Sequence, residues 1–487
     1  MGIVLKQSLR NTAITYIGFG IGAINILFLY TKILPDAYFG LVTFILATGA
    51  ILMPLMAFGV HNTLVKFYAV QADSDKNGFL TLMLLLPLGG ILPIALSVLL
   101  FQDPLGAWLS QKNTLVKEYV WYVFLVGMAM AYFEVFYAWS KVHLKSVFGN
   151  FMKEVFARLC VMLLLVSVYF ELIGIPIFLK SLVGVYLLRT VAMQVYAYRI
   201  RPRKLDFRFP ANTKAIIAYS VLIILGGSAA LVLLEIDKVM INQFVSIENV
   251  AYYGVAVYIA TVIIVPARAM HQITYPLTSE LLAKSDFFEL DSLYKKTSLT
   301  LFIASGLLFL LIILNIEDLF LLLPENYRNG YGIVFLIGLA KVFDSLMGNA
   351  NAILYNSKYY KTILGFGVGL ALLTIMLNLL LIPRLGIDGA ALASFIAIGL
   401  FNLVKMTFIK LKFGFLPFSR GTTKILATLA LLGFLFSAFH FPFHPMLNIV
   451  LKSAVLCVMY VGILYRFEIS EDVSGFLARF LKRRTPQ

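Results

Sequence analysis

Apolar runs of about 20 residues recur along the whole chain, and no other feature restricts its fold as strongly. The first run begins near residue 12, and others follow at short intervals up to residue 466. A helix of about 20 residues crosses a hydrocarbon layer roughly 30 Å thick. Because backbone polar groups must be satisfied inside that layer, we expect the runs to be helices. A transmembrane β-barrel would show alternating segments of about 10 residues, whereas these runs are continuous.

Composition supports the same interpretation. Hydrophobic residues make up 61% of the 487 positions, charged residues only 13%, and the mean hydropathy is +0.91, which is far from the values of soluble domains. We therefore predict an all-α integral membrane protein with about fourteen transmembrane helices, arranged as two pseudo-symmetric six-helix lobes plus two C-terminal helices. The predicted spans are 12–34, 41–62, 79–101, 119–139, 155–172, 175–198, 217–242, 249–270, 298–315, 331–355, 362–382, 389–410, 422–441 and 446–466.

These spans suggest a division into segments. The predicted parts are an N-terminal lobe (1–198), a basic cytoplasmic linker (199–216), a C-terminal lobe (217–410), helices thirteen and fourteen (411–466) and a cytoplasmic tail (467–487). The first span is too long for the core of a signal peptide, so we interpret it as an uncleaved helix. The longest gaps between spans are too short for a folded soluble domain.

Lysine and arginine are distributed unevenly between the two ends of the spans. With the helices placed as above, 30 of these residues fall on one side and only 6 on the other. The positive-inside rule then places both termini in the cytoplasm. The net charge of +16 is explained by topology and by attraction to anionic lipid headgroups, so nucleic acid is not an expected partner.

Motifs for catalysis or cofactor binding are missing from the sequence. Cys160 and Cys457 both lie in apolar spans, the five histidines are scattered, and there is no HExxH, GxGxxG or Walker loop. No long extracytoplasmic loop displays paired carboxylates. We therefore expect neither an enzyme nor an ATP-driven pump, and no cofactor, with H⁺ or Na⁺ left open as a coupling ion.

An internal repeat is visible between residues 31–67 and 242–277. Each copy has a short turn, an aromatic-glycine step (Phe39-Gly40; Tyr253-Gly254), an apolar helix broken by proline, and then a histidine. The copies are six helices apart, so they are expected to be parallel repeats related by an axis along the membrane normal. Two such lobes are the usual framework of an alternating-access transporter.

The stretch "NLLLIPRLGIDGAALASFIAIGL", residues 378–400, interrupts the apolar pattern. Pro383 ends one predicted helix, and Gly389 allows the backbone to turn before the next one starts. The small residues that follow allow close approach to a neighbouring helix.

Three motifs at the expected helices resemble one family. "IPRLGIDGAALAS" is similar to the IPxxGxxGAAxA turn of polysaccharide exporters in the multidrug/oligosaccharidyl-lipid/polysaccharide (MOP) superfamily. "EIDKVMINQFVSIENVAYYGVA" resembles the D-[RK]-x-M pattern of that family at helices seven and eight, and "TKILPDAYFGL" resembles its LGxxx[YF]G turn, with Ile33-Leu34-Pro35 in place of the usual Leu-Gly.

This resemblance implies a flippase that moves polyprenyl-diphosphate-linked oligosaccharides, such as O-antigen or capsule repeat units, to the outer leaflet of a bacterial inner membrane. It implies lipids as partners, with a polysaccharide polymerase and glycosyltransferases acting beside it. Two alternatives remain open: a cation-coupled multidrug exporter of the same superfamily and a lipid II flippase. The drug exporters often carry an acidic residue in helix one, where this chain has only Asn25.

A diphosphate headgroup needs fixed cations in a cleft, so charges inside the spans are the candidates for its contacts. Arg189 lies near the middle of the sixth span, and Arg268 shares a helix face with His271. Lys180 is expected to reach the outer interface. The full set of substrate-binding candidates is Arg268, Arg189, Lys66, His271, Lys180 and Lys341.

A second group of polar residues is proposed for gating or ion coupling. Asp237 is adjacent to Lys238, so local charge balance is one interpretation, and Asp344 follows Lys341 by three residues. Glu134 is expected to pair with Lys141 or Lys145 at the cytoplasmic end. The gating or coupling candidates are Asp237, Lys238, Asp344 and Asn25.

Overall fold

The computed structural model describes residues 2–109, 112–202, 204–439 and 441–469, and within them every regular element is a helix. Ten helical segments of this part of the chain are long and apolar enough to cross a membrane. The protein is therefore an all-helical membrane protein. Each of the fourteen predicted spans overlaps one helix, two or three consecutive helical segments, or one arm of a longer helix. Arg203 of the predicted linker and most of the predicted tail, from residue 470, lie outside the described residues.

Packing divides the chain into two compact units. Unit 1 comprises residues 1–254 and 367–390, and unit 2 comprises residues 255–366 and 391–487. The lobe boundaries predicted from the sequence remain a prediction. The helices of unit 1 are α1 (Gly2–Ile24), α2 (Tyr30–Ile33), α3 (Asp36–Met56), α4 (Val60–Phe67), α5 (Lys76–Leu85), α6 (Leu88–Leu100), α7 (Gln102–Leu109), α8 (Val120–Val142), α9 (Val147–Phe151), α10 (Ala157–Tyr169), α11 (Ile175–Ile200) and α12 (Thr213–Phe244).

Two helices contribute to both units. They are α13 (Glu248–Thr261) and α19 (Tyr360–Phe413). The helices that lie within unit 2 are α14 (Val265–Ala283), α15 (Phe287–Leu314), α16 (Ile316–Leu321), α17 (Tyr331–Leu346), α18 (Ala350–Asn356), α20 (Arg420–Ser437) and α21 (Pro445–Arg466).

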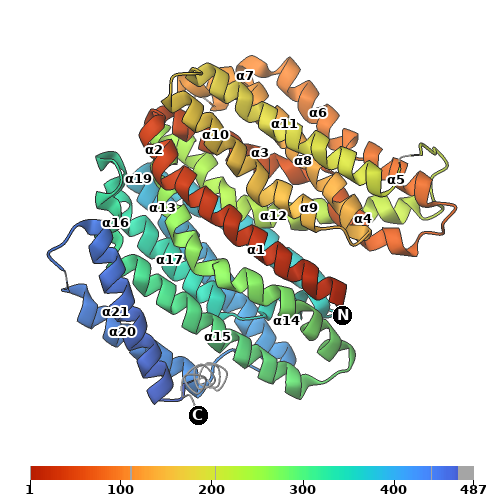
Figure 1. Ribbon diagram of the computed structural model, residues 1–487. Helices are drawn as coiled ribbons and strands as arrows, with labels where there is room; N and C mark the ends of the chain where they lie inside the picture. The colour runs from red at the N-terminus through yellow and green to blue at the C-terminus, as the bar shows by residue number, and fades with distance from the viewer. Residues whose placement is uncertain (1, 110–111, 203, 440, 470–487) are drawn as a thin grey trace, which may run out of the picture. The chain divides into compact units, whose positions relative to one another are not determined.

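In unit 1, α8 packs between α3 and α11, and α12 packs against α3 and α4 (Figure 1). Glycines permit two of the tightest contacts in this unit. A Cβ on Gly18 of α1 would lie 2.4 Å from the carbonyl oxygen of Glu154, and one on Gly149 would overlap the ring of Tyr137. Any larger residue at these positions would push α1 or α9 away from its neighbour. These two contacts hold the segment 147–169, which carries Lys153, Glu154 and Arg158, close to α1 and α8.

The turn predicted at residues 383–389 is present, but the residues that form it differ from those expected. Pro383 stays within α19, and the chain reverses at Gly386, whose φ of 59° is open to glycine. A Cβ on Gly389 would lie 2.3 Å from the carbonyl oxygen of Leu381, although eight residues of straight helix span about 12 Å. Gly386 therefore makes the turn, and Gly389 allows the second arm to pack against the first.

In unit 2, α15 packs against α14, α17 and α20. The C-terminal helix is joined to the α15–α16 corner by buried polar contacts. Lys452 of α21 donates to the carbonyl oxygen of Leu314 at 2.6 Å, and Asn448 donates to the carboxylate of Asp318 at 2.5 Å. A lysine that satisfies an orphan carbonyl at the end of α15 gives this apolar helix a fixed position along the unit.

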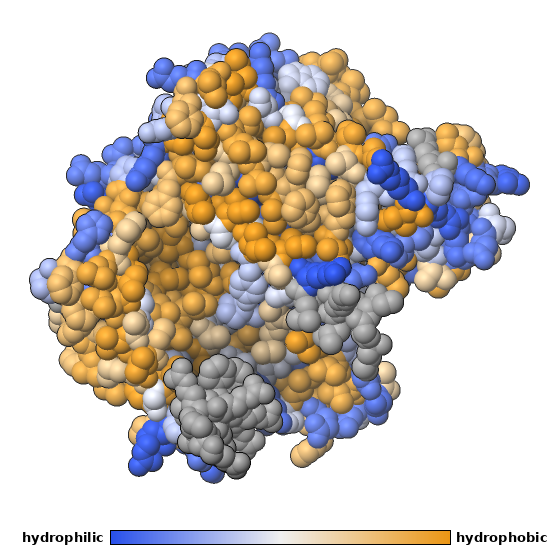
Figure 2. Space-filling view, in the orientation of Figure 1, coloured by the Kyte–Doolittle hydropathy of each residue, from blue (hydrophilic) through white to orange (hydrophobic). Residues whose placement is uncertain are grey.

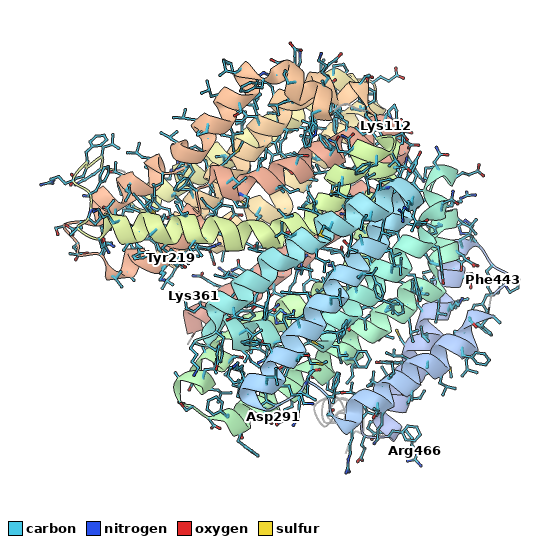
Figure 3. All side chains as sticks on the ribbon, turned by 180° about the vertical axis from the view of Figure 1, so that it is seen from behind. Lys112, Tyr219, Asp291, Lys361, Phe443 and Arg466 are labelled. Atoms are coloured by element: carbon cyan, nitrogen blue, oxygen red, sulfur yellow. The ribbon has the colours of Figure 1, made fainter. Side chains whose placement is uncertain are left out.

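Apolar side chains cover most of the face seen in Figure 2, and hydrophilic residues gather toward its margins. In unit 2, Phe443 lies at one end of the helices, while Asp291 and Arg466 lie at the other (Figure 3). This arrangement agrees with the alternation of loops that the predicted spans require.

The predicted orientation leads to a labelling experiment. Lys112 and Ser285 are both exposed, in loops predicted to lie on opposite sides of the membrane. In a variant with Cys160 and Cys457 replaced by alanine, Lys112→Cys should react with an impermeant maleimide in intact cells, and Ser285→Cys should react only after permeabilisation. The reverse pattern would overturn the orientation.

Candidate functional site

Five ionisable side chains from four segments of unit 1 form a group around Glu134. We call them the unit 1 cluster: His61 of α4, Glu134 and Lys141 of α8, Lys153 of the π-helical segment Met152–Phe156, and Arg189 of α11. His61 is within electrostatic reach of Glu134 and of both lysines, and Arg189 is within reach of Glu134. Three cations therefore share the carboxylate of Glu134. A second carboxylate, Glu154, is within electrostatic reach of Lys153 and Arg189 and forms an ion pair with Arg158.

Glu134 and Lys153 form the central ion pair of the unit 1 cluster. The Lys153 Nζ lies 2.5 Å from the Glu134 Oε1. Only 8% of Glu134 is exposed, whereas the Lys153 side chain is 45% exposed. The pairing of Glu134 expected from the sequence was with Lys141 or Lys145, and this expectation was wrong about the partner. Lys141 instead lies over the ring of Tyr137, 3.8 Å from its centroid.

Arg189 has no ion pair within the described residues, although it is only 6% exposed. Its guanidinium carbon lies 4.3 Å from the ring centroid of Phe133 and 4.7 Å from that of Tyr186. Its Nε–H is buried and has no hydrogen-bond partner within the described residues. A guanidinium held between two rings with an unused donor can bind an acceptor on a ligand.

The chemistry of the unit 1 cluster favours an anion. With His61 neutral, its three cations and Glu134 carry a net charge of +2, since the neighbouring Glu154 is balanced by its ion pair with Arg158. In a low-dielectric interior such an excess is costly unless a negative group compensates it. Phosphate oxygens suit it well because arginine binds them through two parallel hydrogen bonds and lysine binds them as a point charge.

The other substrate-binding candidates are placed as follows. Lys66 is exposed and lies 3.8 Å from the ring centroid of Tyr219 on α12 (Figure 3). Lys180 is exposed near the start of α11, and Arg268 is exposed on α14 with no ion pair among the described residues. Lys341 is half-buried on α17. None of these four belongs to the unit 1 cluster.

Asn25 is buried at the beginning of the π-helical segment Asn25–Leu29. Its amide donates to the carbonyl oxygen of Arg158 at 2.8 Å and so joins the first span to α10. This contact accounts for the residue structurally. A role of Asn25 in ion coupling remains a proposal.

Asp237 is 4% exposed and accepts two hydrogen bonds within unit 1. Tyr253 donates to its Oδ2 at 2.5 Å, and Asn378 donates to its Oδ1 at 2.7 Å. The neighbouring Lys238 forms an ion pair with Glu235 at 2.6 Å. Consecutive residues of a helix point about 100° apart, so Lys238 reaches a residue one turn away while Asp237 faces other helices.

Unit 2 holds a separate charged group. Lys405 of α19 is 1% exposed, and its Nζ lies 3.6 Å from the Asp344 Oδ1 and 3.2 Å from the Asn351 Oδ1. His271 is within electrostatic reach of both charges of the pair. The structure thus brings together two of the predicted candidates, His271 and Asp344, around a lysine that was not predicted.

Three functional candidates were missed because their positions were assigned to helix ends. Lys153, Lys141 and Lys405 were all counted as cytoplasmic charges. The signal that could have identified Lys405 is its place about five residues inside the twelfth span, on a stretch that also carries Asn402. Among the described residues, no group of three or more His, Cys, Asp or Glu side chains could hold a metal ion.

Solved structures of several membrane proteins share this fold. The lipid II flippase MurJ in an inward closed conformation has a TM-score of 0.72 and 13% identity, with coverage of 95% of this chain and 100% of that chain. An inward-facing multidrug resistance MATE family transporter of the MOP superfamily gives 0.64 and 13%, with 84% and 98% covered. A MOP superfamily transporter from Pyrococcus furiosus gives 0.59 and 12%, with 85% and 95% covered.

Sequence comparison identifies the family. No curated protein sequence matches the chain. Residues 4–282, more than half of the chain, match the family described as "Polysaccharide biosynthesis protein". The chain therefore has the fold of the MOP superfamily and belongs to the polysaccharide biosynthesis protein family.

Proposed function

We propose that this protein is a flippase that moves polyprenyl-diphosphate-linked oligosaccharides across a bacterial inner membrane. The observation that carries the proposal is the unit 1 cluster, in which the buried Arg189 has no ion pair within the described residues and two lysines share the carboxylate of Glu134. A diphosphate linked to a prenyl chain brings negative charge into the membrane protein, where this excess of cations needs it.

In this proposal, Arg189 binds one phosphate through its fork of donors, and Lys153 and Lys141 neutralise the remaining charge. Glu134 holds Lys153 in place until the substrate arrives. The rings of Phe133 and Tyr186 keep the guanidinium in position, so little side-chain entropy is lost on binding. Arg268 is a further candidate contact on α14.

A cation-coupled drug exporter is the weaker alternative. Cationic drugs would meet three fixed positive charges in the unit 1 cluster, at a considerable electrostatic cost. A lipid II flippase needs the same diphosphate site, and the fold of this chain is similar to that of a lipid II flippase. The substrate must therefore be identified chemically.

Transport in this proposal proceeds by alternating access of the two predicted lobes, 1–198 and 217–410, with both termini in the cytoplasm. No nucleotide motif is present, so a gradient of H⁺ or Na⁺ or removal of the product supplies the driving force. Asp237, with Tyr253 and Asn378, is the proposed coupling group. A polymerase and glycosyltransferases are the proposed partners.

The test is mass spectrometry of lipid extracts from cells that lack the protein, combined with a stain for surface polysaccharide. Accumulation of a polyprenyl-diphosphate oligosaccharide together with a bare surface is expected, and the mass identifies the glycan. Accumulation of lipid II would select the alternative flippase. Normal lipid pools and a normal surface would refute both.

A further inference from the structure

A constellation of histidine, carboxylate and cation occurs once in each unit. In unit 1 it consists of His61 on α4, Glu134 on α8 and Arg189 on α11. His271 on α14 lies 210 residues after His61, and Asp344 on α17 lies 210 residues after Glu134.

The third pair of residues is separated by a slightly longer interval. Lys405 on α19 lies 216 residues after Arg189. In both units the three residues come from the second, fourth and sixth spans of a repeat. The repeat noticed in the sequence thus extends to charged groups inside the spans, which apolar packing alone does not require.

The two constellations differ in which cation the carboxylate holds. In unit 1, Glu134 pairs with Lys153 at 2.5 Å and leaves Arg189 without an ion pair. In unit 2, Asp344 pairs with Lys405 itself, at the longer distance of 3.6 Å. The cation equivalent to Arg189 is therefore already occupied by a carboxylate of the protein.

Exposure shows which partner an incoming group meets first. The Asp344 side chain is 32% exposed, whereas Lys405 is 1% exposed. Behind the carboxylate, Lys405 is held by Asn351 at 3.2 Å and by the ring of Phe401, 4.5 Å from its centroid. Because Lys405 is buried and the Asp344 side chain is partly exposed, an incoming anion must compete with the Asp344 carboxylate for the ammonium.

His271 completes the site. Its Nδ1 is buried and has no hydrogen-bond partner within the described residues, and its ring lies 5.6 Å from that of Tyr275. A ring nitrogen without a partner beside a loosely paired lysine is an unused polar contact for a ligand.

We propose that Lys405 is a second anion-binding cation, specific for a phosphate group and covered by Asp344 until that phosphate displaces the carboxylate. The inference rests on the proposed function for the identity of the lipid that carries the phosphate. It assigns to unit 2 a site that changes from an internal ion pair to a ligand ion pair, so that the lysine is never buried without a negative partner.

The experiment is isothermal titration of the purified full-length protein in detergent with inorganic diphosphate, with Arg189→Gln in every variant so that binding at the unit 1 cluster does not mask binding in unit 2. Asp344→Asn should bind it about tenfold more tightly because the competing carboxylate is gone, and Lys405→Gln should bind it about tenfold more weakly. The double variant should behave like Lys405→Gln. Asp291→Asn, which removes a 2.6 Å ion pair with Lys295 elsewhere in unit 2, is the control and should leave affinity unchanged (Figure 3).

Equal weakening by Asp344→Asn and Lys405→Gln, or no change in either, would overturn the proposal. In a purely structural pair, the two substitutions would not change diphosphate affinity in opposite directions. If Asp344→Asn does not yield folded protein, Lys405→Arg provides the test. Its affinity for diphosphate should stay within about threefold of the unsubstituted value. A loss of affinity equal to that of Lys405→Gln would refute the site.

The lipid extracts described above separate the two proposals. Diphosphate binding with the expected order in a protein whose absence leaves lipid pools normal would retain the site and refute the flippase. Accumulation of lipid-linked oligosaccharide, with no difference in diphosphate affinity among the variants, would retain the flippase and refute the site.

Discussion

Replacement of Arg189 by alanine is expected to abolish export of the lipid-linked oligosaccharide while the protein still accumulates in the membrane. The guanidinium makes no ion pair with the described residues and contacts mainly the rings of Phe133 and Tyr186. Its removal should therefore change the free energy of unfolding by only about 1 kcal/mol. Loss of a desolvated charge contact to the substrate costs roughly 2–5 kcal/mol, or about 30-fold to several thousand-fold in affinity.

Two companion variants make the measurement specific. Arg189→Lys keeps the charge without the planar fork, so partial export is expected. Arg199→Ala removes an exposed cation from the same helix and should leave export normal. The readout is the cellular level of the lipid-linked oligosaccharide by mass spectrometry, normalised to the amount of protein. Full export by Arg189→Ala at a normal protein level would refute the assignment.

Hydrophobic periodicity predicted the fold well because the membrane imposes one strong requirement on every span. All fourteen predicted spans coincide with helices, including the closely spaced pair 155–172 and 175–198, which became α10 and α11. Gly174 and Pro176 were sufficient to separate them. The division into compact units could not be read in this way, because it depends on which helix faces pack together.

The site was only partly predictable for a related reason. Arg189 stands out in the sequence because it lies deep inside an apolar run. Lys153 does not, because it follows a basic loop, and only the π-helical segment and the close packing around Gly149 bring it to Glu134. Adjacency in sequence was misleading for Asp237, whose partners Tyr253 and Asn378 are distant along the chain. Which charged residues pair with one another depends on the tertiary structure.

The repeat shows how much sequence reasoning can recover once one contact is known. His61 and His271 were matched by their positions after the proline breaks. Adding the same interval to Glu134 leads directly to Asp344. The sequence contained this correspondence, but a carboxylate near a helix end gave no reason to look for it until the structure placed Glu134 among buried groups.

Replacement of Glu134 by alanine is expected to be the most destabilising change in unit 1. It leaves Lys153 without its 2.5 Å partner and removes the carboxylate that lies within electrostatic reach of all three cations of the unit 1 cluster. Breaking a buried pair in this way costs about 3–5 kcal/mol, and a loss of roughly 3 kcal/mol is expected because Lys153 is 45% exposed. Lys153→Ala should cost only about 1 kcal/mol, since Glu134 keeps Lys141 and Arg189 within electrostatic reach.

Thermal unfolding in detergent checks this asymmetry. Glu134→Gln combined with Lys153→Gln should recover most of the stability that Glu134→Ala loses, because two amides can hydrogen-bond without a charge imbalance. Glu280→Ala removes the carboxylate of an exposed pair with Lys284 and should change stability by less than about 1 kcal/mol. Equal losses for Glu134→Ala and Lys153→Ala would contradict the net positive charge of the unit 1 cluster. Since that charge is the reason to expect an anionic substrate, the proposed diphosphate site would lose its electrostatic basis.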